Sequence, residues 1–119
     1  MNETREQKMA AAKARLAELA AKFIERTQGD LRTMRRDLEK VGAGDAAALA
    51  EIRHLAHRMA GTGATLGFEA LGARAAGAEA VIDALPGGTL PDAQTIARLA
   101  ADIGALESQL ATDAGRAAT

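Results

Sequence analysis

The spacing of apolar residues constrains the fold of this chain more than any other feature. Apolar positions recur every three or four residues along almost its whole length, as on one face of an α-helix. The series reappears in four segments, at about residues 16–41, 49–66, 71–85 and 96–110. No segment alternates between apolar and polar residues over the length of a β-strand, so we expect helices and no strands.

Turn and capping residues separate these segments. Thr4, with Gln7 three residues later, predicts a capping box at the start of the first helix. Asp45 predicts the N-cap of the second helix, directly after a glycine-rich stop. The later boundaries are expected at Gly67, at the break in residues 86–88, and at Pro91 and Asp92.

Four amphipathic helices with short connections predict an all-α fold, an antiparallel up-and-down four-helix bundle. We expect a single domain over residues 1–119, with its core at about residues 14–111. Residues 1–13 are either an extra short helix or an extension of the first helix. Residues 112–119 are expected to form a loose tail.

The composition excludes several classes of protein. Hydrophobic residues make up 48% of the chain but aromatic residues only 2%, as in packed helices rich in alanine and leucine. A net charge of −1 gives no reason to expect nucleic-acid or membrane binding. There is no cysteine and no apolar run of about 20 residues. We expect a cytoplasmic monomer.

The second helix carries both histidines of the chain, His54 and His57. With about 100° per residue, His57 lies roughly 150° from the apolar sector and points away from the core. Gly61 lies one turn later on the same face and leaves room for a bulky group to approach the ring. Gly63 falls on the core side, where it predicts close helix packing.

An exposed histidine of this kind can act as a nucleophile. A neutral imidazole nitrogen is nucleophilic near pH 7, and a hydrogen bond can hold the other nitrogen. A histidine without a serine or cysteine partner suits phosphoryl acceptance, which needs cationic groups near the phosphoryl oxygens. Arg53, one turn before His57, and Arg74, on the flank of the third helix, are the candidates.

The stretch HRMAGTGATLG, residues 57–67, resembles the signature of histidine-containing phosphotransfer (HPt) domains. That signature is a histidine, an apolar residue two positions later, lysine-glycine, small residues and leucine-glycine. Leu71, Ala75, Ala78 and Glu79 resemble the next helix of the family, and residues 23–45 resemble its long helix and glycine-aspartate turn. The resemblance covers about residues 16–110.

The resemblance implies a stoichiometric phosphoryl carrier rather than a turnover enzyme. His57 would accept a phosphoryl group from a receiver-domain aspartate or a hybrid histidine kinase, and pass it to a response-regulator receiver domain. Gly61 would give clearance. The chain would bind no cofactor, and Mg²⁺ would be held by the partner receiver domain. Docking is expected through residues around His57, namely His54, Ala60, Ala64 and Phe68.

Two alternatives accompany this interpretation. The family usually has a lysine three residues after the histidine, where this chain has Ala60. That departure favours a helical interaction module that binds a receiver or kinase without accepting phosphate. His54, His57 and Glu51 could also form a metal site, which is weak because a fourth ligand is missing.

Overall fold

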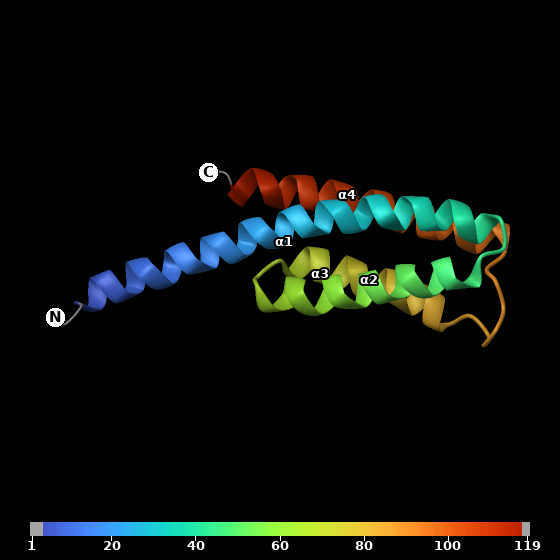
Figure 1. Ribbon diagram of the computed structural model, residues 1–119, viewed down its shortest axis with the longest axis horizontal. Coiled ribbons are helices and arrows are strands. Elements are labelled where there is room, and N and C mark those ends of the chain that lie inside the picture. The colour runs from blue at the N-terminus through green and yellow to red at the C-terminus, as the bar shows by residue number, and fades with distance from the viewer. Residues whose placement is uncertain (1–3, 118–119) are drawn as a thin grey trace.

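The computed structural model describes residues 4–117, and these residues form four α-helices and no strand. The helices are α1 (Arg5–Gly42), α2 (Ala46–Thr65), α3 (Glu69–Asp83) and α4 (Ala93–Ala117), which run alternately in opposite directions (Figure 1). Helices α1 and α3 each pack against both α2 and α4, whereas the diagonal pairs do not meet. The predicted antiparallel four-helix bundle is confirmed.

Capping residues begin three of the four helices, and two of them, Thr4 and Asp45, are the predicted caps. Thr4 and Gln7 form a reciprocal capping box, with hydrogen bonds of 2.8 and 3.1 Å. The Asp45 carboxylate accepts from the first backbone N–H groups of α2. The Asp92 carboxylate accepts from the N–H of Thr95 in the first turn of α4. Each cap pairs N–H groups that a helix start leaves without an intrahelical partner.

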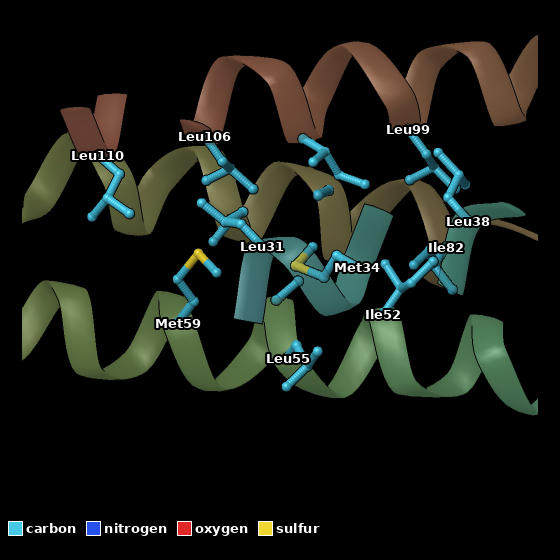
Figure 2. Close-up of a cluster of buried hydrophobic side chains, with 14 of the residues drawn as sticks. Leu31, Met34, Leu38, Ile52, Leu55, Met59, Ile82, Leu99, Leu106 and Leu110 are labelled. Atoms are coloured by element: carbon cyan, nitrogen blue, oxygen red, sulfur yellow. The ribbon is translucent and has the colours of Figure 1, made fainter. Parts of the chain in front are cut away.

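The core lies along the axis of the bundle and follows the predicted apolar spacing. Leucine, isoleucine and methionine side chains from all four helices meet there (Figure 2). Burial of each such side chain contributes about 1.5–3 kcal/mol. The most deeply buried of these large apolar side chains are Met34, Ile52, Leu71, Leu99, Ile103 and Leu106.

Two glycines allow α2 and α3 to approach closely. A Cβ added at Gly63 would lie 3.3 Å from the carbonyl oxygen of Phe68. A Cβ added at Gly72 would lie 3.1 Å from the carbonyl oxygen of Ala60 and 3.3 Å from the nitrogen of Ala64. The predicted packing role of Gly63 agrees with these distances, and Gly72 performs the same role from α3.

The two ends of the chain differ from the expectation. Residues 5–13 are the first turns of α1, so the extension alternative holds, while residues 1–3 lie outside the described part. Leu16 and Leu19 are 59% and 43% exposed, because α1 projects beyond the turn that joins α2 to α3 (Figure 1). Helix α4 continues to Ala117, so residues 112–117 are helical and do not form the expected loose tail.

One acidic side chain is buried between α1 and α2. Asp37 is 3% exposed, and one of its carboxylate oxygens has no hydrogen-bond partner. Burial and the neighbouring Glu51 carboxylate raise the pKa of Asp37 to about 6.

Across the described residues, no helix is both long enough and apolar enough to cross a membrane.

Candidate functional site

His57 lies on the outer face of α2, and its side chain is 68% exposed. On the opposite face, Ile52, Ala56 and Met59 are 0–2% exposed and belong to the core. The predicted outward orientation of His57 is therefore confirmed. Helix α2 holds the ring on a rigid element, because packing of its inner face fixes the backbone beneath it.

The ring of His57 is held from the neighbouring helix by Glu79. Its Nδ1 atom lies 2.8 Å from Oε2 of Glu79, whose side chain is only 15% exposed. A carboxylate can only accept hydrogen bonds, so Nδ1 carries the proton and donates it. In the neutral ring, this tautomer leaves the lone pair on Nε2, the nitrogen that does not contact Glu79.

Arg53 contacts the same carboxylate. Its guanidinium lies 3.3 Å from Oε2 of Glu79 and also forms an ion pair with Asp83. The hydrogen bond with Asp83 raises the pKa of Arg53, and the same bond lowers the pKa of Asp83. Arg53 thus joins two carboxylates of α3 on the Nδ1 side of the ring, so its charge is already compensated. Its predicted role at a phosphoryl group stays a prediction.

The structure does not bring Arg74 to His57. Arg74 is exposed on α3 and makes no hydrogen bond or ion pair with any residue between 4 and 117. It lies five residues before Glu79, which places it about 140° around α3 from the side chain that holds the ring. His54 is exposed on α2, on the side of His57 that faces away from α3.

The residues beside the ring of His57 have small side chains or none. Gly61 and Ala64 are exposed, and Ala60 is half-buried. A Cβ added at Gly61 would meet no atom within 4 Å, which agrees with the predicted clearance. Phe68 differs from the other predicted docking residues, because its half-buried ring stacks on Phe23 with 5.1 Å between centroids. Phe68 therefore contributes mainly to packing at the end of the core.

Sequence reasoning gave Glu79 and Asp83 no role in the site. The spacing of charged residues contained a signal for both. Arg53 and His57 are four residues apart on α2, and Glu79 and Asp83 are four apart on α3. In antiparallel helices these two pairs come into register, so that His57 meets Glu79 and Arg53 meets Asp83.

The site at His57 is a surface and not a cavity. An open hollow of about 510 Å³ lies between α1 and α4, lined largely by alanine, and it does not include His57. Within residues 4–117 no group of three or more histidine or acidic side chains could hold a metal ion. The alternative metal site at His54, His57 and Glu51 is therefore not formed. The exposed ring can react with a group that a second macromolecule presents.

The sequence matches the Hpt domain family over residues 18–110, and the chain therefore belongs to this family. Hpt domains carry out phosphotransfer in two-component phosphorelays and interact with receiver domains and kinases. Comparison with curated proteins and with solved structures returns no significant match.

Proposed function

We propose that His57 is the phosphoacceptor of this chain. It receives a phosphoryl group from a receiver-domain aspartate or a hybrid histidine kinase and passes it to the receiver domain of a response regulator. The observation that carries this proposal is the 2.8 Å contact between Nδ1 of the exposed His57 and the Glu79 carboxylate. It leaves an unprotonated Nε2 on an open face of α2, as a nucleophile requires.

The transfer step is a displacement at phosphorus. The Nε2 lone pair forms the N–P bond while the bond between phosphorus and the aspartyl oxygen breaks, and the electron pair leaves with the aspartate carboxylate. No proton has to leave Nε2 first, because Nδ1 holds the only ring proton. The phosphorylated ring gains positive charge, which the Glu79 carboxylate at Nδ1 compensates. Transfer to the next receiver reverses these bond changes.

The exposed small residues around His57 fit a protein partner. Gly61 and Ala64 extend from His57 toward the end of α2 without a bulky side chain. A receiver domain can lay its active site over this low surface and bring its aspartate in line with Nε2. The partner would hold the Mg²⁺, and this chain would act as a monomeric, cytoplasmic carrier without a cofactor of its own.

A second candidate function keeps the docking surface without the transfer. Ala60 replaces the usual lysine, and the guanidinium of Arg53 is engaged with Glu79 and Asp83. Position 60 therefore supplies no cation, and the charge of Arg53 is already paired with two carboxylates. These two observations favour an interaction module that binds a receiver or kinase but is not phosphorylated.

The test is phosphoryl transfer from a radiolabelled phospho-receiver or hybrid kinase of the same cell. Wild type is compared with His57→Gln and His54→Gln, two matched changes on the same face of α2. We expect acid-labile label on wild type and on His54→Gln, and none on His57→Gln. Label that survives in His57→Gln would refute the assignment. If wild type binds these donors but accepts no label, the interaction module is the correct function.

A further inference from the structure

The first turns of α1 extend beyond the turn that joins α2 to α3 (Figure 1), and Ala17, Ala20 and Ala21 line the open hollow that α1 forms with the end of α4. Residues 5–22, called the arm below, precede Phe23, the first buried residue of α1 (Figure 1). Residues 5–19 are all exposed. The capping box at Thr4 and Gln7 nevertheless gives this part of the helix a well-formed start.

The arm carries an apolar seam that residues 4–117 leave largely exposed. Of the four exposed large hydrophobic residues in the described chain, three lie on the arm: Met9 at 64%, Leu16 at 59% and Leu19 at 43%. With Ala12 and Phe23 they follow alternating spacings of three and four, as do the a and d positions of a coiled coil. Phe23 is buried where the seam enters the bundle, so the seam continues the face on which α1 packs against its neighbours.

Basic residues flank this seam. With Met9 and Leu16 at a positions, the g positions are Lys8, Arg15 and Lys22, all basic, and the e positions are Glu6, Lys13 and Ala20. The arm has five basic and two acidic side chains, a formal charge of +3 within a chain of net charge −1. Residues at e and g lie beside the partner helix in a coiled coil and determine which partner is accepted.

The charge pattern disfavours a second copy of the chain on the seam. In a parallel pair, Lys8 would face Lys13 of the other copy. In an antiparallel pair, the g positions of the two copies would face each other, and all three are basic. Like charges brought together in this way oppose association.

We infer that the arm is a docking site for an amphipathic helix of another protein, whose apolar seam is flanked by aspartate or glutamate. Such a helix packs on Met9, Leu16 and Leu19. It covers this exposed part of α1 in the way that the other helices of the bundle cover the rest of α1. Its acidic side chains pair with Lys8, Lys13, Arg15 and Lys22. This interaction does not depend on phosphoryl transfer at His57.

The probe is a synthetic helical peptide of about three heptads with leucine at a and d and glutamate at e and g. A matched peptide carries lysine at e and g. Their binding to the full chain is measured by fluorescence anisotropy with three variants: Leu16→Gln/Leu19→Gln on the seam, Ala11→Gln/Ala14→Gln on the opposite face of the arm, and His57→Gln. Circular dichroism checks the folding of each variant.

We expect the glutamate peptide to bind at least about tenfold more tightly than the lysine peptide. The seam variant should lose this binding, whereas the opposite-face variant and His57→Gln should keep it. Equal binding of both peptides, or retention of binding by the seam variant, would overturn the inference. Self-association of the chain in sedimentation equilibrium would also overturn it, if the seam variant abolishes that self-association. The same holds for binding to phosphatidylserine vesicles that requires Leu16 and Leu19, when neither peptide binds.

Discussion

Glu79 Oε2 lies 2.8 Å from His57 Nδ1, although the two residues are 22 positions apart and belong to different helices. The contact decides which nitrogen of the ring holds the proton and which is left to react. It also places a negative charge beside the ring, where positive charge develops on phosphorylation. The side chain that would set the proposed reactivity of His57 therefore comes from α3, while α2 carries the histidine itself.

Glu79→Gln should slow phosphoryl acceptance. The amide can accept from Nδ1 in one orientation and donate to it in the other, so both tautomers become possible and the compensating charge is lost. We expect a fall of roughly 10- to 100-fold in the transfer rate, as for other partners that orient a histidine. The ¹⁵N shifts of His57 should change from one tautomer to a mixture. Glu69→Gln, an exposed change on the same helix, should leave both the rate and the shifts as in wild type.

Arg53→Gln should have a smaller effect, because Arg53 contacts the ring only through Glu79. The informative measurement is a double-mutant cycle between Arg53→Gln and Glu79→Gln, read as transfer rate. If Arg53 positions the Glu79 carboxylate, its removal should add little once Glu79 is changed. Fully additive losses would instead place Arg53 at the phosphoryl group, as the sequence-based prediction had it.

Gly72→Ala should destabilise the bundle and disturb the site. Its new Cβ would press on backbone atoms of Ala60 and Ala64 and force α2 and α3 apart. We expect a loss of about 1–3 kcal/mol in the free energy of unfolding, measured with urea. Gly61→Ala is the matched control, because open space surrounds that site, and it should gain about 0.5–1 kcal/mol. Equal stability of the two variants would mean that close approach of α2 and α3 is not required.

Asp37 should make stability depend on pH. Its pKa of about 6 in the folded chain exceeds the ordinary value of about 4, so the folded state holds a proton that the unfolded chain releases between these values. The stabilisation is complete below about pH 4 and is lost as pH rises through about 6. Asp37→Asn should therefore be more stable than wild type at pH 8, by about 1–3 kcal/mol, but not at pH 4.

Urea denaturation at both pH values measures this difference. Glu39→Gln, an exposed change nearby on α1, serves as the control and should show no such dependence. A constant gap between Asp37→Asn and wild type at the two pH values would show that the buried carboxyl does not titrate in this window.

Local sequence signals predicted most of the fold. The apolar spacing predicted the four helices, and Thr4 and Asp45 predicted the caps of the first two, because capping depends on residues close in the chain. The same periodicity indicated that His57 faces outward, since the apolar residues of α2 define its inner face. Gly63 could be assigned to close packing for the same reason.

Contacts between helices could not be predicted in the same way. The periodicity of α2 does not reveal which residue of α3 lies opposite His57 or Arg53, so the contacts of these two residues with Glu79 and Asp83 could not be predicted. Leu16 and Leu19 continue an apolar face, but periodicity does not tell whether another helix covers it. The stacking of Phe68 on Phe23 could not be predicted either, because it depends on how distant segments pack together.

The hydrogen-bonded cluster of His57, Glu79, Arg53 and Asp83 lies within α2 and α3, which a three-residue turn connects. Helices α1 and α4 contribute no side chain to it. The chemistry proposed for His57 therefore depends on the hairpin of residues 46–83, and substitutions on the outer surfaces of α1 and α4 would leave these four side chains unchanged.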